Sequence, residues 1–462
     1  MTIWKPDLSH HTGPLYLAIA DAMVAGIEGG ELKAGDRLPP QRILAFDLGL
    51  TVGTVTRAYA EAERRGLVTG EVGRGTFIRG ADSKRNVPFC IVEDEETGIV
   101  DLSLNFPTEA GQAARYAKTA AELAADANVD LLLRYQPAAG NPRHRAAMAA
   151  LAARGGVHVP PERVVVTSGA QHAMTVVFGS ICRPGDVVLA EELAYPGIIA
   201  VARVLHLRLR GVALDGEGLR PDAFEAACRK GDAKALYCVP TYQNPTSAVM
   251  GESRRAEIAA IARENGVTIV EDDVYGFLHD SPPKPLATFL PEATYYISST
   301  SKSMMPALRL GFVVCPEGMT DAVAETVRTT TWMANPLAAD VVSRWVADGT
   351  VDAFANQHRS ESRARLDVAR RVLAGVPFHS APGTSHIWLP LPAPWSADDF
   401  VGRAAARNVR LISAKPFAVT GMVPQALRIC LGSPATRDDL ERGLTVVADL
   451  MRSAPDQPFA VV

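Results

Sequence analysis

The sequence predicts an α/β protein in two parts, and three patterns lead to this expectation. Residues 14–79 contain three helical periodicities followed by two short β-like runs. From residue 101 onward, apolar runs typical of strands alternate with helical segments, which predicts a mostly parallel sheet with helices on both faces. From roughly residue 335, two more strand-like runs lie between helices, which indicates a smaller C-terminal α+β subdomain.

The composition is typical of a globular protein with a large core. Hydrophobic residues make up 47% of the 462 residues and charged residues 21%. No apolar run approaches the length of a membrane-spanning helix, and the first residues lack the pattern of a secretory signal. Six cysteines without C-x-x-C spacing predict buried thiols in a reducing cytosol and no metal site. We therefore expect a cytoplasmic protein that does not bind a membrane.

The N-terminal block has the element order of a winged helix-turn-helix. PLYLAIADAMVAGI is apolar at helical spacing, and Pro14 before it suits a first turn. PQRILAFDLG predicts a second helix that ends at Gly49, and Thr51 is expected to N-cap a third helix, VGTVTRAYAEAERRG. LVTGEVGRGTFI then predicts a β-ribbon. The motif indicates a DNA-binding domain, and a small helical bundle with another role is the alternative interpretation.

Charge does not decide between these two interpretations. Residues 1–80 contain nine basic and nine acidic side chains, so a basic surface has to arise from their positions. A recognition helix places its polar first turn in the major groove, while other side chains contact the backbone. The predicted DNA contacts are Arg42, Thr51, Thr54, Thr56, Arg57 and Arg74, the last at the tip of the ribbon.

Three separated pieces of the block, GDRLPPQR, LTVGTVTRAYAEAERRGLV and GRGTFI, resemble the GntR-type winged helix. The resemblance implies a transcriptional regulator that binds operator DNA. Many relatives carry a basic or amide-bearing pair after the capping residue, whereas this chain has Val52 and Gly53. The operator sequence therefore does not carry over.

Residues 80–100, GADSKRNVPFCIVEDEETGIV, are polar and show no sustained period, which predicts a linker. The expected domains are thus a winged helix over 1–79, a linker over 80–100 and a large domain over 101–462. The small subdomain occupies roughly 335–462 of the large domain.

The stretch SSTSKSMMPALRLG places Lys302 after serines at the end of a predicted strand, with Arg309 seven residues later. An amine that condenses with an aldehyde cofactor needs a lowered pKa, and a phosphate group needs hydroxyls and a guanidinium beside it. Taken alone, this stretch is better explained as a surface lysine at the start of a helix.

Polar residues follow four other predicted strands. TSGAQHAM opens a helix whose free N–H groups can hold a phosphate. Asp272 can keep a pyridine nitrogen protonated, Asn244 and Tyr275 can hydrogen-bond a ring hydroxyl, and Tyr195 can stack on a ring. Each of these residues alone has an ordinary structural explanation. Together they predict a cofactor site, because α/β sheets bind ligands at the carboxyl ends of their strands.

The order of these motifs resembles the fold-type I aminotransferases that depend on pyridoxal 5'-phosphate, over residues 101–462. The resemblance implies that Lys302 is the Schiff-base lysine, that Asp272 binds the pyridine nitrogen and that Tyr195 stacks on the ring. Asn244 and Tyr275 would contact the phenolic oxygen. The implied phosphate-binding residues are Gly169, Ala170, Gln171, Ser299, Ser301 and Arg309.

Two further residues are implied by the same resemblance. Arg428, in ALRICLG, occupies the place where such enzymes bind a substrate α-carboxylate, a task that suits a bidentate guanidinium. Tyr135, in RYQPAAG, is expected to reach the phosphate in the neighbouring subunit of a homodimer.

A GntR-type winged helix fused to an aminotransferase-like domain is the arrangement of the MocR family of bacterial regulators. The expected function is a transcription regulator that senses an amino compound through an aldimine at Lys302, with little or no enzymatic turnover. The chain is similar to regulators of ectoine utilisation, which suggests an effector from that catabolism. The alternatives are a working aminotransferase with an appended DNA-binding domain and a sensor of pyridoxal phosphate itself.

Overall fold

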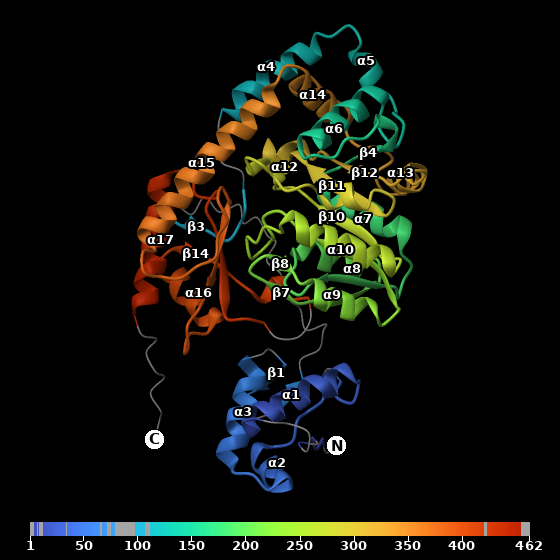
Figure 1. The fold of residues 1–462 in the computed structure, drawn as a ribbon. Helices are drawn as coiled ribbons and strands as arrows, with labels where there is room; N and C mark the ends of the chain where they lie inside the picture. The colour runs from blue at the N-terminus through green and yellow to red at the C-terminus, as the bar shows by residue number, and fades with distance from the viewer. Residues whose placement is uncertain are drawn as a thin grey trace. The chain divides into compact units, whose positions relative to one another are not determined.

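The computed structural model describes residues 4–6, 8, 13–33, 35–64, 67–71, 75–78, 98–106, 111–419 and 423–453. The chain forms two compact units, of which the first is Met1–Glu95 and the larger begins at Glu96 (Figure 1). The predicted linker, 80–100, falls outside the described residues except for its last three.

The N-terminal unit has the predicted element order. Three helices precede an antiparallel strand pair: α1 (Leu15–Glu28), α2 (Gln41–Leu48), α3 (Val52–Arg64), β1 (Val68–Glu71) and β2 (Gly75–Ile78).

Local chemistry explains the boundaries of α2 and α3. Gly49 ends α2 in the left-handed conformation at φ 65°, which glycine adopts without steric cost. Thr51 caps α3 as predicted, because its Oγ accepts a hydrogen bond from the Thr54 amide at 3.2 Å. Val55 and Tyr59 point from α3 into the core of this unit, where they pack with residues of α1 and α2.

The larger unit is built on a seven-stranded sheet whose order is β4-β12-β11-β10-β9-β5-β6. Only β12 runs antiparallel to its neighbours, so the prediction of a mostly parallel sheet is confirmed. The strands are β4 (Val164–Thr167), β5 (Val187–Glu191), β6 (Arg208–Val212), β9 (Ala233–Cys238), β10 (Thr268–Asp272), β11 (Thr294–Ser299) and β12 (Gly311–Val314).

Strands β6 and β12 were not predicted. The edge strand β6 alternates arginine with apolar residues, and β12 has only four residues and follows the Lys302 segment closely. The β6 pattern lacks the continuous apolar run by which a buried parallel strand is recognised, whereas β12 is a short apolar run that is buried along its whole length.

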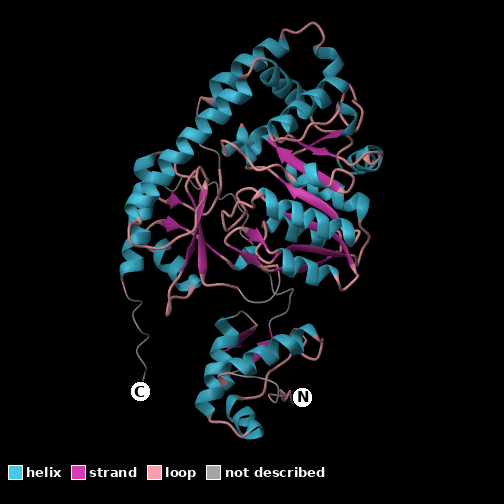
Figure 2. Cartoon of the chain, viewed as in Figure 1, coloured by secondary structure: helices cyan, strands magenta, loops and turns pink. Residues whose placement is uncertain are grey.

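Helices cover both faces of the sheet, as Figure 2 shows. In β9, Ala235 and Tyr237 face one hydrophobic cluster while Leu236 and Cys238 face another, which is the alternation of a pleated strand. The first cluster packs against α7 (Ala170–Ile181), α8 (Pro196–Val204) and α13 (Thr320–Thr330). The opposite face packs against α6 (Pro142–Arg154), α9 (Pro221–Cys228), α10 (Glu252–Glu264), α11 (Leu286–Phe289) and α14 (Pro336–Ala347).

The C-terminal region forms its own three-stranded antiparallel sheet, β13-β16-β15. Its elements are β13 (His386–Pro390), α16 (Ala397–Ala405), β14 (Val409–Arg410), β15 (Ile412–Ser413), β16 (Ala426–Cys430) and α17 (Arg437–Arg452). Most residues of the hydrophobic core around this sheet come from Leu366 onward. Two come from much earlier in the chain: Val100 in β3 (Val100–Asp101) and Leu102 just after it. By contrast, α14 packs in the core of the large sheet, although the predicted subdomain begins near residue 335.

Helix α15 (Thr350–Val372) joins the two cores of the larger unit. Val351 and Phe354 near its start are buried with the large sheet, whereas Leu366 and Ala369 near its end are buried in the C-terminal core. The remaining short elements are α4 (Gln112–Ala124), α5 (Val129–Leu132), β7 (Leu214–Asp215), β8 (Gly218–Leu219), α12 (Thr300–Ser303) and the 3-10 turns Pro161–Arg163, Gly276–Leu278, Pro306–Leu308 and Lys415–Phe417.

The cysteines of the described segments carry free thiols, and Cys90 lies outside those segments. Across the ranges given above, no group of three or more His, Cys, Asp or Glu side chains is arranged to hold a metal ion. Among the same residues, no helix combines the length and apolarity needed to cross a lipid bilayer.

Candidate functional site

The carboxyl ends of the parallel strands bring most of the predicted site residues to one edge of the sheet. Strand β4 is antiparallel to β12, which is antiparallel to β11, so β4 points the same way as the parallel strands. The residues at or shortly after these strand ends are Gly169, Tyr195, Asn244, Asp272 and Ser299. This edge is where ligands bind in open α/β sheets.

Lys302 lies in the short helix α12, directly after β11. Its Nζ donates a hydrogen bond to the backbone carbonyl of Asn105, whose side-chain amide donates to the Tyr275 hydroxyl at 3.1 Å. Burial, together with the positive charges of Arg428 and Arg309, lowers the pKa of Lys302 from 10.5 to about 8. The side chain is therefore a more available nucleophile near neutral pH than an ordinary lysine.

Asp272 is buried, with 3% of its surface exposed, and one of its carboxylate oxygens has an unmet hydrogen-bonding capacity. Oδ2 accepts a hydrogen bond from the Tyr237 hydroxyl at 2.8 Å, whereas Oδ1 has no partner among the described residues. Burial raises the pKa of Asp272 to about 6. A buried carboxylate with one unsatisfied oxygen fits the protonated nitrogen of a pyridine ring, which would satisfy that oxygen and favour the ionised form.

The predicted phosphate-binding residues lie together. Arg309 donates from Nη1 to the Ser301 hydroxyl at 3.4 Å, and the Ser301 amide donates to the Ser299 hydroxyl at 3.3 Å. Gly169 adopts φ 89°, and a side chain there would place its Cβ 2.8 Å from Nη2 of Arg309. Glycine is thus required both by the backbone and by the close guanidinium. Ala170 begins α7, whose amino-terminal N–H groups point to the same place.

Gln171 differs from the other predicted phosphate contacts in the structure. Its Nε2 donates to the Gly197 carbonyl at 3.1 Å and so ties the start of α7 to the start of α8. Tyr195 immediately precedes α8. Burial raises the pKa of Tyr195, and the charges of Asp272, Arg428 and Arg309 act on it, which places this phenol among the charged groups of the site.

Arg428 on β16 reaches the site from the C-terminal sheet. It donates to Asn244 Oδ1 at 3.0 Å and to the Ser103 carbonyl at 2.5 Å, and its Cζ lies 4.8 Å from the centre of the Phe417 ring. Its Nε is buried and has no partner among the described residues. An anionic group would satisfy this donor, which agrees with the predicted carboxylate-binding role.

Several site residues were missed by sequence reasoning. Asn105 and Tyr237 make direct hydrogen bonds to Lys302 and Asp272, yet Asn105 stands 197 positions before Lys302 and Tyr237 lies inside an apolar strand run. His358 and Ser362 of α15 line a small cavity of about 20 Å³ together with Lys302 and Tyr275. No local motif marked these helix residues.

Tyr135 stays outside this group of contacts. Its side chain is 80% exposed, and its ring centre lies 5.5 Å from that of Trp332. The segment that carries it is held by Gln136, which donates to the Leu131 carbonyl at 2.7 Å and accepts from Asn141 at 3.5 Å.

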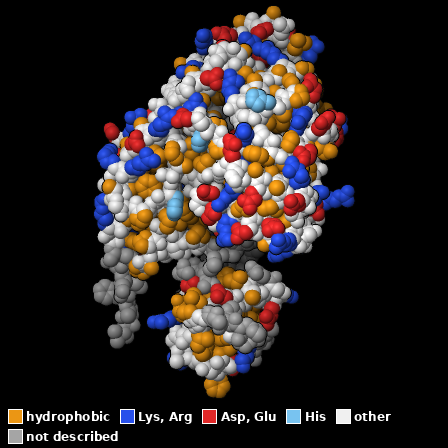
Figure 3. Space-filling model, viewed as in Figure 1, with side chains coloured by type: hydrophobic (Ala, Val, Ile, Leu, Met, Phe, Trp, Pro, Cys, Tyr) orange, Lys and Arg blue, Asp and Glu red, His pale blue; other side chains and the backbone are white. Residues whose placement is uncertain are grey.

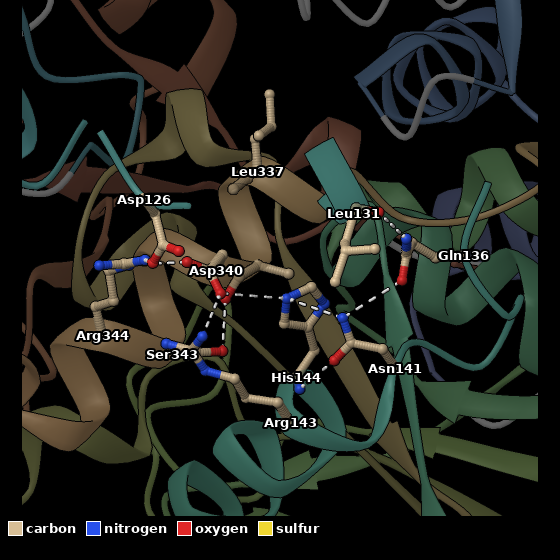
Figure 4. A network of polar contacts seen from close by, with 12 residues as sticks. Asp126, Leu131, Gln136, Asn141, Arg143, His144, Leu337, Asp340, Ser343 and Arg344 are labelled. Atoms are coloured by element: carbon tan, nitrogen blue, oxygen red, sulfur yellow. Dashed lines mark hydrogen bonds and ion pairs between the residues drawn. The ribbon is translucent and has the colours of Figure 1, made fainter. Parts of the chain in front are cut away.

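Figure 4 shows how this segment is anchored to the helices behind it. Asn141 caps α6 by accepting from the His144 amide at 2.9 Å, and its own amide lies 3.3 Å from the His144 ring. The buried Asp340 on α14 lies 3.8 Å from His144, 3.1 Å from Arg143 and 2.8 Å from Arg344. Contacts with His144 and Arg344 outweigh the effect of burial and lower the pKa of Asp340 to about 2.

The N-terminal unit places most predicted DNA contacts at its surface. Arg42, Thr51, Thr56 and Arg57 are exposed, and Thr54 is half-buried. The Thr56 hydroxyl donates to Gln41 at 2.8 Å, so it also links α3 to α2. Arg74 lies outside the described residues.

Comparison with known proteins identifies both parts of the chain. Residues 97–447 match the aminotransferase class I and II family, and residues 15–78 match the gntR family of bacterial regulatory proteins. The HTH-type transcriptional regulator YdeF of Bacillus subtilis is 28% identical, covering 97% of this chain and 96% of its own. The vitamin B6 salvage pathway transcriptional repressor PtsJ of Salmonella typhimurium is also 28% identical, covering 94% of this chain and 96% of its own.

Among solved structures, the kynurenine aminotransferase of Pyrococcus horikoshii is similar with a TM-score of 0.72. It is 23% identical and covers 78% of this chain and 92% of its own, which shows the likeness of the fold. The predicted fold class is therefore confirmed, and family membership confirms pyridoxal 5'-phosphate as the cofactor. The chain belongs to the aminotransferase class I and II family and carries a GntR-type helix-turn-helix at its N-terminus, the combination found in MocR regulators.

Proposed function

We propose that the chain is a pyridoxal phosphate-dependent transcription regulator whose larger unit senses an amino compound and thereby changes the affinity of the N-terminal unit for operator DNA. One observation supports this proposal most strongly. The same chain contains a DNA-binding domain and a lysine, Lys302, whose pKa is lowered to about 8 by burial. An enzyme alone has no use for the first of these parts. An effector acts in this way when it binds two states of the protein with different affinities.

Each side chain of the site supports a defined task. When bound, the cofactor supplies an aldehyde that can be exchanged between the amine of Lys302 and the amine of a ligand. Asp272 would hold the ring nitrogen with its unpaired Oδ1. Gly169, Ser299, Ser301 and Arg309 would hold the phosphate, as the sequence predicts.

The effector would be an amino acid or a related amino compound with a carboxylate. Arg428 supports this assignment because its buried Nε lacks a partner and its guanidinium lies over the Phe417 ring. Asn244, which accepts from Arg428, would fix the guanidinium when a carboxylate binds.

We further propose a homodimer. Five exposed apolar side chains occur along the Tyr135 segment and at the ends of α13 and α14: Leu131, Leu133, Tyr135, Trp332 and Leu337. Such a cluster on a globular unit favours burial against a partner. A second copy would bring its own Tyr135 toward this chain's phosphate-binding residues.

The deciding experiment is to titrate candidate amines, including products of ectoine breakdown, into the holoprotein while recording the absorbance of the cofactor and operator binding. A reversible spectral change with altered operator affinity supports the sensor. Steady conversion of the cofactor to its aminated form, with release of a keto acid, would instead show a working aminotransferase. Arg428→Ala should weaken the response to a carboxylate-bearing effector with cofactor still bound, and an unchanged response would rule out the assigned role of Arg428.

A second candidate, a sensor of the cofactor itself, is favoured by one observation. A relative 28% identical to this chain is a vitamin B6 salvage pathway repressor. This alternative predicts that pyridoxal phosphate without any amine changes operator affinity, and the same titration tests it.

A further inference from the structure

A buried histidine of the C-terminal sheet lies beside the site at Lys302. His386 is the first residue of β13, is fully buried and has no part in the tasks assigned above. It pairs with Cys430, which stands two residues after Arg428 on β16. Paired residues, and residues two apart on a strand, share one face of a sheet. His386 therefore lies on the same face as Arg428, while Ile387 packs on the other face, in the C-terminal core.

The surroundings of His386 fix the protonation of its ring. Nε2 lies 3.1 Å from the backbone carbonyl of Gln243, which can only accept a hydrogen bond, so Nε2 carries a hydrogen. Burial, together with the positive charges of Arg428 and Lys302, lowers the pKa of His386 to about 3, so the ring is neutral at physiological pH. Nδ1 therefore carries no hydrogen and can only accept a hydrogen bond.

This Nδ1 atom determines how the side-chain amide of Asn105 is oriented. Nδ2 of Asn105 lies 3.4 Å from Nδ1 of His386, and it lies 3.1 Å from the hydroxyl groups of both Tyr275 and Ser385. A hydroxyl can donate or accept, so neither hydroxyl distinguishes the NH₂ end of the amide from its oxygen. His386 does distinguish them, because the opposite orientation would place an amide oxygen against a bare ring nitrogen. The NH₂ group of Asn105 is thereby held toward Tyr275.

The orientation of Asn105 sets the direction of the hydrogen bond at Tyr275. The Tyr275 oxygen accepts from the amide, which leaves its O–H to donate to a ligand. Burial raises the pKa of Tyr275, so this phenol keeps its proton at neutral pH. With the amide reversed, the O–H of Tyr275 would donate to the oxygen of Asn105 and would be lost to the ligand.

We propose that His386 is a positioning residue that acts through Asn105 to orient the O–H of Tyr275 toward the phenolic oxygen of bound pyridoxal phosphate. The inference rests on the proposed function and on the contact between Tyr275 and this oxygen that the sequence predicts. A hydrogen bond from Tyr275 stabilises negative charge on the phenolic oxygen and weakens its hold on the proton that it shares with the nitrogen of Lys302. His386 thereby lowers the pH at which this proton is lost.

The test records the absorbance of the bound cofactor in the full-length holoprotein as a function of pH, which gives the midpoint for loss of this proton. His386→Phe keeps an aromatic ring but removes the Nδ1 acceptor. The midpoint should rise by about half a pH unit or more, because a charge-assisted hydrogen bond is weakened. His386→Leu removes the same acceptor with a smaller side chain and should give a similar rise. Unchanged midpoints in variants that fold and bind the cofactor would overturn the proposal.

A double-mutant cycle separates positioning through Tyr275 from a general structural effect. Tyr275→Phe removes the O–H itself and should raise the midpoint by about one pH unit. Once this O–H is absent, adding His386→Phe should cause no further rise. An equal rise from His386→Phe in both backgrounds would show that His386 does not act through Tyr275 and would overturn the proposal.

Ser385→Ala is the matched control, because Ser385 contacts the same amide group of Asn105 but can either donate or accept. It should leave the midpoint unchanged. A rise as large as that of His386→Phe would show that any neighbour of Asn105 has this effect, which contradicts the role assigned to His386.

The absorbance midpoint also separates this inference from the proposed function, because it reports on the cofactor site and not on operator binding. The expected midpoints in a holoprotein whose operator affinity responds to no amine would refute the proposed function and support the role of His386. Unchanged midpoints in a holoprotein that does respond to amines would refute the role of His386 alone.

Discussion

Replacing Lys302 with methionine should stabilise the protein without cofactor at neutral pH. The lysine pKa falls from 10.5 to about 8 on folding, a difference of about 2.5 pH units that corresponds to about 3 kcal/mol of unfolding free energy. Because the folded state disfavours the charged amine, this cost is fully present below pH 8. It declines as pH rises from about 8 to 10.5, where the unfolded chain also loses its proton.

The net gain is smaller than the full electrostatic cost. Methionine also removes the hydrogen bond from Lys302 to the Asn105 carbonyl, and a lost hydrogen bond of this kind costs about 1 kcal/mol. We therefore expect Lys302→Met to be more stable than the wild type by about 2 kcal/mol at pH 7. At pH 10 the electrostatic cost falls to about 1 kcal/mol, so the advantage should nearly vanish.

The measurement is urea unfolding of both apoproteins at pH 7 and pH 10, followed by tryptophan fluorescence. Four of the five tryptophans lie in the larger unit, so the signal reports mainly on the unit that contains Lys302. Comparing variant with wild type at each pH cancels the titration of all other groups. An equal stability difference at both pH values would refute a depressed lysine pKa.

Three other variants test the remaining structural assignments. Asp340→Asn should cost about 2 kcal/mol at pH 7 in urea unfolding, since contacts with His144 and Arg344 lower the pKa of Asp340 from 3.8 to about 2. This deficit should shrink as pH falls from about 4 toward 2, and a deficit independent of acid pH would contradict it. Thr51→Ala removes the cap of α3 and should cost the N-terminal unit about 1 kcal/mol, measured by thermal unfolding; no change would show that the cap is dispensable. Arg57→Ala should weaken operator binding in a mobility-shift assay with the cofactor spectrum unchanged, and undiminished binding would exclude its contact with DNA.

The sequence predicts the parts of this fold that rest on local pattern. The recognition helix was placed because Thr51 is a good cap and Gly49 a good helix terminator, and both act in this way in the structure. The buried parallel strands were recognised from their apolar runs. Strand β6 was not predicted because its arginines interrupt the apolar pattern. Arginines are accommodated there because β6 lies at the edge of the sheet, where solvent is accessible on one side.

The site was predictable only in part, for a related reason. Lys302 and Asp272 sit at strand ends, where chain order alone suggests a ligand site. Their direct partners, Asn105 and Tyr237, have no such marker, because they were brought near by tertiary packing across long sequence separations. The distribution of charge does not mark the site either. Figure 3 shows basic and acidic side chains interspersed over the visible face of the larger unit.

Helix α15 has a mechanical consequence for the pocket beside Lys302. Its 23 residues make a rod of about 34 Å, and each end is fixed in a different hydrophobic core. A rotation of one core against the other must therefore bend the rod between Phe354 and Leu366. His358 and Ser362 line the pocket from this middle section, so the curvature of one helix sets how far their side chains stand from Lys302.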